Sequence, residues 1–176
     1  MDWISEIKKL RDDRNLSDAK AAAELGISKP FLSEVLNGKK ELSAKLKLKI
    51  LSLRTLDIDQ DCLLAFLPSK VASQLSHLDK TRDGARGDPK PKVPLTHDWI
   101  VDLVEIRDRQ GLNSSEFSDQ LGMSQSFVSG LFTGKKPVTW GLKVFAWQQM
   151  NYDLSCDTLL NFLPHEIAAQ LSDKYR

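Results

Sequence analysis

The chain has 176 residues, of which 41% are hydrophobic and 28% are charged, and its formal net charge is +1. This length allows one large domain or two small ones, and the composition is typical of soluble globular proteins. A net charge near zero excludes a bulk field that would draw the whole chain onto nucleic acid or membrane, so such binding must come from local patches.

The sequence carries no signal for secretion or membrane insertion. Its first residues, MDWISEIKKLRDD, include acids and lack the apolar core of a secretory signal, and no apolar run is long enough for a spanning helix. The two cysteines, Cys62 and Cys156, lie far apart and have no partner at metal-ligand spacing, so we expect both to be reduced and buried. These features predict a cytoplasmic protein with no membrane partner.

The first part of the chain has the pattern of a series of short helices. An apolar stripe at helical spacing opens it, formed by Trp3, Ile4, Ile7 and Leu10. Ser17 can cap a second helix that Gly26 ends, and Ser28 can cap a third that ends before Gly38. Three more helices are predicted at about 43–53, at 60–66 and from Pro68 onwards, because proline is tolerated in a first turn.

A segment of different composition follows, HLDKTRDGARGDPKPKVPLTH, from His77 to His97. It is rich in charge, glycine and proline and has no apolar period, which is typical of a flexible linker. We therefore predict an N-terminal domain at 1–76, a flexible linker at 77–97 and a C-terminal domain at 98–176.

The sequence after this linker repeats the sequence before it. Trp99 lies 96 positions after Trp3, and at this offset the match runs without a gap as far as LLAFLPSKVASQLS and LLNFLPHEIAAQLS. Roughly a third of the aligned positions are identical, which favours duplication over chance, and each copy is long enough to fold alone. No stretch alternates with period two, so we predict an all-α fold class with two tandem domains joined by the linker.

The two copies share one motif, LGISKPFLSEVLNGKK from Leu25 and LGMSQSFVSGLFTGKK from Leu121. A short helix, a tight turn with glycine and a second short helix opened by serine describe a helix-turn-helix. The motif resembles the Cro/lambda-repressor-like (XRE-type) helix-turn-helix family. The positions that match the family pattern are Ser17, Ala22, Leu25, Gly26, Ile27, Ser28, Leu32, Ser33, Val35, Gly38 and Lys39 in the first copy and Leu121, Gly122, Met123, Ser124, Gln125, Ser126, Val128, Ser129, Leu131, Gly134 and Lys135 in the second. The resemblance covers the first four helices of each copy and implies two lambda-repressor-like domains.

The outer face of the third helix in each copy holds the candidate base-reading residues. In DNA-binding relatives this face enters the major groove. The base-reading residues that the resemblance implies are Lys29, Pro30, Ser33 and Glu34 in the first copy and Gln125, Ser126, Ser129 and Gly130 in the second. Gln125 can bond adenine N6 and N7, Lys29 can donate to guanine, and Glu34 can accept from cytosine. Because these letters differ between the copies, we expect two different preferred sequences; free drift of surface positions after duplication is the alternative explanation.

Candidate phosphate contacts surround the same two helices. They are Ser28, Asn37, Lys39, Lys40 and Lys45 in the first copy and Ser124, Thr133, Lys135 and Lys136 in the second. Gly-Lys-Lys follows the third helix in both copies, where the family places contacts to the DNA backbone, and such contacts supply most of the affinity. Asp18 departs from the family, which usually has Gln at this first position of the second helix, and its charge disfavours a nearby phosphate.

The resemblance implies a sequence-specific transcription regulator, a repressor of the phage or mobile-element type, whose partner is a double-stranded DNA operator. Relatives commonly bind as dimers, so a homodimer is one option for the oligomeric state. The alternative function is a protein-binding adaptor, antiactivator or antitoxin-like, which needs a protein partner; the low net charge, Asp18, Glu34 and the acidic second copy favour it. Neither metal-ligand clusters nor phosphate loops nor nucleophile elbows occur in the sequence, so we expect no enzyme activity, no metal and no cofactor.

Overall fold

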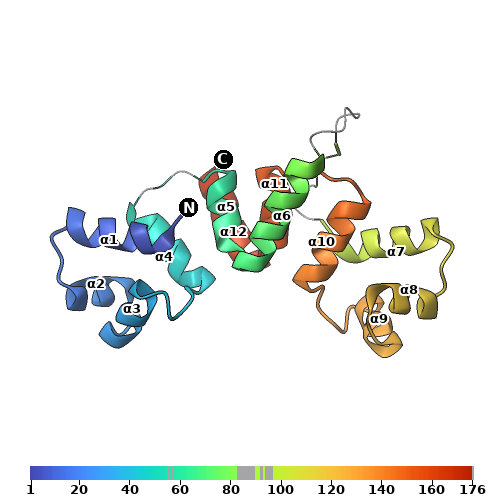
Figure 1. The fold of residues 1–176 in the computed structure, drawn as a ribbon, viewed down its shortest axis with the longest axis horizontal. Coiled ribbons are helices and arrows are strands. Elements are labelled where there is room, and N and C mark those ends of the chain that lie inside the picture. Colours follow the sequence, from blue (N-terminus) through green and yellow to red (C-terminus); the bar gives the residue numbers. More distant parts are fainter. Residues whose placement is uncertain (55, 57, 83–89, 92, 94–96, 176) are drawn as a thin grey trace. The chain divides into compact units, whose positions relative to one another are not determined.

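The computed structural model of the chain describes residues 1–54, 56, 58–82, 90–91, 93 and 97–175. These residues contain helices and no strand, which confirms the all-α prediction, and none of the described helices is both long and apolar enough to cross a membrane. In chain order (Figure 1) the helices are α1 (Trp3–Asp13), α2 (Asp18–Leu25), α3 (Lys29–Leu36), α4 (Ala44–Arg54), α5 (Gln60–Phe66), α6 (Ser69–Arg82), α7 (Trp99–Arg109), α8 (Ser114–Leu121), α9 (Gln125–Phe132), α10 (Trp140–Gln149), α11 (Cys156–Phe162) and α12 (His165–Tyr175).

The helix bounds of the second half follow those of the first half. α7, α8, α9 and α11 begin and end 96 positions after α1, α2, α3 and α5. α10 and α12 begin 96 positions after α4 and α6, and each ends earlier than its counterpart. The offset of the helices is therefore the offset of the sequence match.

Local signals set the bounds of the helices around the shared motif. The hydroxyls of Ser28 and Ser124 cap α3 and α9 by accepting a hydrogen bond from the backbone amide three residues later, at 3.3 Å in each case. Gly26 and Gly122 end α2 and α8 with φ of 71° and 64°, the left-handed region in which glycine pays no steric cost. The same residue types therefore start and stop the same helices in both halves.

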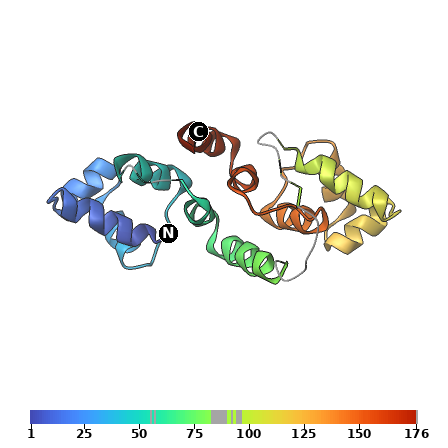
Figure 2. The same cartoon turned by 90° about the horizontal axis from the view of Figure 1, so that it is seen from above.

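The helices pack into two compact units, and these units differ from the two sequence copies in one helix each: the last helix of each copy belongs to the unit of the other copy. The first unit comprises Met1–Pro68 and Leu163–Arg176, and the second comprises Ser69–Phe162. Consequently α12 packs against α4, although it follows α11 in the chain, and α6 packs against α10, although it follows α5 (Figure 2). Leu171 of α12 and Leu75 of α6 are both 0% exposed, so each exchanged helix contributes a core residue to the unit that contains it. The boundaries at 1–76 and 98–176 describe the repeat and stay a prediction.

The two cores are anchored by corresponding aromatic pairs. Trp3 packs edge-on against Phe66, with ring centroids 5.1 Å apart, and Trp99 packs against Phe162 at the same distance. All four side chains are buried. Such edge-to-face pairs favour one relative orientation of the rings beyond simple apolar burial. Each pair therefore fixes the first helix of a copy against its fifth. Of the cysteines, Cys62 is buried as predicted, whereas Cys156 at the start of α11 is only half-buried.

The predicted linker at 77–97 begins inside a helix. α6 continues to Arg82, and the half-buried Leu78, three positions after the buried Leu75, extends its partly buried face beyond residue 77. Val93, also within the predicted linker, is 1% exposed, and the carbonyl of Pro91 accepts a hydrogen bond from the backbone amide of Asp153 at 3.1 Å. These residues therefore pack within the second unit. Residues 83–89, 92 and 94–96 lie outside the described residues, so a flexible linker there stays a prediction.

Candidate nucleic-acid interface

Two helix pairs, α2 with α3 and α8 with α9, have the geometry of the motif found in the sequence. The helices of each pair pack against one another across the turns at 26–28 and 122–124 (Figure 1). On α3, Leu32 and Val35 are 1% and 0% exposed, and on α9, Val128 and Leu131 are both 0% exposed. Because one face of each second helix is committed to the core, the opposite face is left to solvent.

The predicted base-reading residues lie on these solvent faces. The residues that are exposed are Lys29, Pro30, Ser33 and Glu34 on α3 and Gln125, Ser126 and Ser129 on α9. Gly130 differs from the predicted open surface, because the Lys136 side chain lies against it and leaves it half-buried. The fold thus brings each set together on one helix. The reading role of these residues remains a prediction.

The predicted phosphate contacts at the helix ends already serve the helices themselves. Ser28 and Ser124 accept the capping hydrogen bonds described above, and the Ser124 hydroxyl also shares a hydrogen bond of 3.2 Å with the Ser126 hydroxyl. Asn37 donates through Nδ2 to the carbonyl of Ser33 at 2.8 Å, and Thr133 donates through Oγ1 to the carbonyl of Ser129 at 3.0 Å. These last two side chains therefore commit one donor each to the final turn of α3 and α9.

Exposed lysines follow the ends of both α3 and α9. The residues are Lys39 and Lys40 after α3 and Lys135 and Lys136 after α9. Lys45, the remaining candidate, is exposed on α4 and lines, with Lys49, a cleft of about 280 Å³ that α4 forms with α12. Glu166 on α12 lies in the wall of the same cleft, so a carboxylate shares the surroundings of Lys45. The sequence alone did not indicate this neighbour.

Asp18, the residue that departs from the family pattern, has a cationic neighbour. Arg11 Nη1 lies 3.1 Å from Asp18 Oδ1, and the two side chains are 33% and 50% exposed. The pair is worth little to stability at this exposure, because solvent screens it. It places a positive charge next to the carboxylate at the start of α2, which weakens the repulsion that Asp18 alone would exert on a phosphate.

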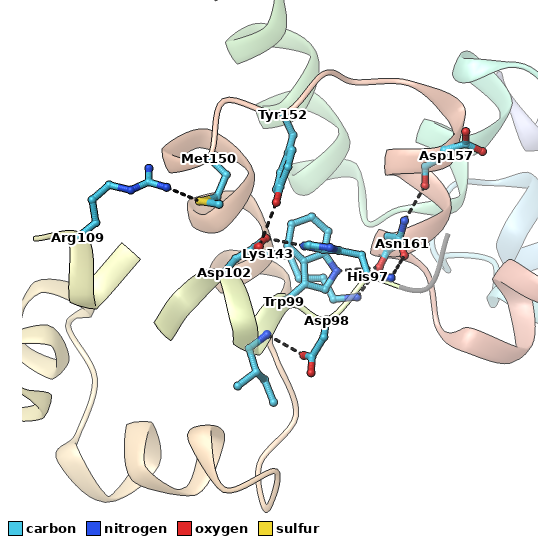
Figure 3. Close-up of polar contacts among 11 residues, drawn as sticks. His97, Asp98, Trp99, Asp102, Arg109, Lys143, Met150, Tyr152, Asp157 and Asn161 are labelled. Carbon is cyan, nitrogen blue, oxygen red and sulfur yellow. Dashed lines mark hydrogen bonds and ion pairs between the residues drawn. The ribbon is translucent and has the colours of Figure 1, made fainter. Parts of the chain in front are cut away.

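Two lysines that look like surface cations in the sequence are structural. Lys143 Nζ donates to the carbonyls of Asn161 and Phe162 at 2.9 and 3.0 Å, at the end of α11, where the indole of Trp99 also donates to Asn161 at 3.1 Å (Figure 3). Burial lowers the pKa of the Lys143 ammonium to about 8. This cation therefore caps the end of α11.

The corresponding lysine of the first unit has the same role. Lys47 Nζ donates to the carbonyls of Ala65 and Phe66 at 2.7 and 3.4 Å, and the indole of Trp3 donates to Ala65 at 2.8 Å. Burial lowers the pKa of Lys47, and the charge of Glu41 opposes that shift. A signal was present in the sequence, since tryptophan and lysine recur at the same offset, but their partners were not predictable from spacing.

A buried polar cluster surrounds Asp102 in the second unit. The equivalent Glu6 of the first unit, 8% exposed, has different partners and pairs with Lys9 at 2.8 Å and Arg54 at 3.2 Å. The Asp102 carboxylate is 2% exposed; its Oδ2 lies 2.6 Å from His97 Nε2, and its Oδ1 accepts from the Tyr152 hydroxyl at 3.0 Å (Figure 3). Burial and the Asp102 charge raise the pKa of the Tyr152 hydroxyl. Positions 1, 6 and 56 of the first copy carry Met, Glu and Leu instead. The cluster joins His97, two residues before α7, and Tyr152, three residues after α10, to the buried side of α7, so we interpret it as an anchor for α7.

The part of the chain that the structure describes holds no group of three or more His, Cys, Asp or Glu side chains placed to bind a metal ion.

The helix-turn-helix of the first unit is the feature that comparison with known proteins recognises. Residues 7–53, from the first half of α1 almost to the end of α4, match the model of a helix-turn-helix family. No curated protein and no solved structure matches the chain. Residues 7–53 therefore form a helix-turn-helix domain of the XRE type, a kind of domain that suggests DNA binding and is typical of regulators that are not enzymes.

Proposed function

We propose that the chain is a sequence-specific transcription regulator that binds double-stranded DNA, a repressor of the phage or mobile-element type. One observation carries the proposal: α3, inside the segment that matches the family, buries Leu32 and Val35 and leaves Lys29, Ser33 and Glu34 in solvent. A helix held in this way can enter the major groove with its polar face towards the base edges.

The proposed contacts divide into reading and positioning. On α3, Lys29 supplies a donor for guanine and Glu34 an acceptor for the amino group of cytosine. On α9, the Gln125 amide suits adenine, and Ser126 and Ser129 are short partners for several bases. Lysines at 39–40 and 135–136 and the serine caps hold the DNA backbone, which sets affinity without carrying sequence information.

We further propose that α8 and α9 form a second reading head. The support is the matching helix offset, the serine cap of α9 and the Gly-Lys-Lys that follows it. Because the exposed faces of α3 and α9 differ at most positions, the two heads prefer different boxes. Two linked heads also raise the effective concentration of the second once the first is bound, so weak individual boxes suffice.

A protein-binding adaptor is the second candidate function, and acidic groups on the proposed DNA face favour it. Glu34 is exposed in the middle of the α3 face, and Asp18 is 50% exposed at the start of α2. Either carboxylate would repel a phosphate that came close. A protein surface rich in Lys or Arg would instead form ion pairs with both carboxylates.

The salt dependence of binding distinguishes the two functions. We expect the full chain to bind a mixed-sequence duplex of about 30 base pairs with an affinity that falls steeply as salt rises, because released counterions drive the association. Fluorescence anisotropy of the labelled duplex at several salt concentrations measures the slope. An absence of duplex binding at low salt by folded protein would contradict the proposal and favour the adaptor.

A further inference from the structure

The Lys136 side chain lies where a side chain at position 130 of α9 would be. A Cβ atom built on Gly130 would lie 2.9 Å from Lys136 Cγ, 3.8 Å from its Cβ and 3.9 Å from its Cε. Real Cβ atoms essentially never approach a carbon to less than 3.0 Å, so any side chain at 130 would displace the lysine. The aliphatic stem of Lys136 therefore occupies the place where a residue at 130 would carry its own side chain.

The backbone holds Lys136 in this position. The carbonyl of Gly130 accepts hydrogen bonds from the amides of Lys135 and Lys136, at 2.8 and 3.0 Å, and from the Thr133 hydroxyl at 3.2 Å. Three donors thus converge on one carbonyl. They fold the segment after α9 back over the helix end, and the contact between Gly130 and Lys136 is part of that turn.

The presence of Lys136 at the place of a side chain at position 130 changes the charge of the exposed face of α9. α9 itself contains no charged residue, and the segment that follows it brings the side chain of Lys136 against this face at Gly130. At the matching position α3 carries Glu34, which is exposed, and the matching lysine is Lys40. The two reading helices therefore present opposite charge at the same helical position, a negative one on α3 and a positive one on α9.

We propose that the Lys136 side chain reads a base at the place where a side chain of residue 130 would otherwise do so. Gly130 has no side chain and therefore leaves the space that Lys136 occupies. An ammonium at this position can donate to guanine O6 and N7, the two acceptors that guanine presents in the major groove. This inference rests on the proposed function and changes one part of it: Lys136 moves from the backbone-contacting group to the base-reading group, and Gly130 acts by positioning Lys136.

The test compares the full chain with its variants Lys136→Met and Gly130→Ala. A randomised duplex library gives the preferred box of α9, and anisotropy gives the affinity for that box and for single-base variants of it. We expect one guanine position to lose about tenfold discrimination in either variant, and the double variant to lose no more than each single one. Gly130→Ala retains the lysine and favours the helix, so its loss of discrimination would come from displacement of Lys136.

Two controls identify the source of any loss. Lys135→Met should lower affinity for all duplexes by the same factor, and Glu34→Ala should alter the box of α3 and leave the box of α9 unchanged. An equal loss for all duplexes in Lys136→Met, or undisturbed discrimination in Gly130→Ala, would overturn the inference while duplex binding by the wild-type chain stands. Failure of the wild-type chain to bind any duplex would instead overturn the proposed function, and this inference with it.

Discussion

Lys143 illustrates how a residue's role depends on contacts that spacing does not reveal. Its position on α10 looks like that of any solvated lysine, yet its ammonium donates to two carbonyls at the end of α11 and is half-buried. Lys47 repeats the arrangement with α5. Helical periodicity placed both lysines on a helix, but it could not predict which helix end would lie beside them, because that depends on packing between distant segments.

The lowered pKa of Lys143 predicts a stability that rises with pH. Its folded value of about 8 lies below the ordinary value of 10.5, so between these values the unfolded chain binds more protons and the free energy of unfolding increases with pH. We expect denaturant titrations at about pH 7.5 and 9.5 to show a smaller increase for Lys143→Met than for the wild type. Tyr152 acts in the opposite sense only above about pH 10, because its pKa is raised. Equal slopes in both proteins would contradict this role.

Gln125 is the residue whose reading role can be tested most directly. It is exposed at the first position of α9, where a bidentate amide can meet adenine N6 and N7. Replacing Gln125 by Ala should cost about 1–3 kcal/mol on the preferred box and relax one base position. The matched control is Gln148→Ala on α10, also exposed, for which we expect unchanged base preference. An unaltered preference in Gln125→Ala would remove Gln125 from the reading set.

At the scale of the element, the helices of the motif were predictable because each boundary has a local cause. Ser28 caps α3 and Gly26 ends α2 with a positive φ. Both residue types are recognisable in the sequence as signals for the start and the end of a helix. The end of α6 was not predictable to the same degree. Its last turns lie in a charged stretch that resembles a linker, and the partly buried Leu78 that continues the helix is a single apolar residue among polar neighbours.

The segment after α3 has a separate, testable role in affinity. Lys39 and Lys40 are exposed directly after the helix end, where phosphates would pass if α3 occupies the groove. Changing both to Ala should weaken binding to all duplexes and reduce the slope of log affinity against log salt by about two. Lys70→Ala with Lys80→Ala on α6 is the control for loss of two exposed charges. A slope unchanged in the Lys39 and Lys40 variant would place these lysines off the DNA backbone.

At the scale of the molecule, the exchange of α6 and α12 was beyond sequence reasoning. The two helices carry nearly the same apolar pattern, VASQLS in α6 and IAAQLS in α12, so either could cover α4 or α10. Leu75 and Leu171 are equivalent in the repeat, and both are fully buried. Because the two helices have the same apolar face, the pattern predicts that this face of each helix is buried. It does not predict which of the two units each helix packs into.

The exchange predicts reciprocal effects of two equivalent substitutions. Leu171→Ala on α12 should destabilise the first unit by about 2–5 kcal/mol, because it leaves a cavity against α4. Hydrogen exchange followed by mass spectrometry should then show faster exchange in α4. Leu75→Ala on α6 should do the same to α10. Faster exchange in α10 for Leu171→Ala would mean that each copy keeps its own last helix, which contradicts the packing described here.

We propose that the chain reads DNA sequence through two unlike helices, α3 and α9. The most direct measurement is selection of binders from a randomised duplex library with the full chain at roughly physiological salt, with folding checked by circular dichroism. We predict enrichment of two boxes of different sequence, one altered by substitutions on α3 and the other by substitutions on α9. No enrichment by folded protein would contradict the claim and leave the protein-binding adaptor as the function that its exposed acidic groups favour.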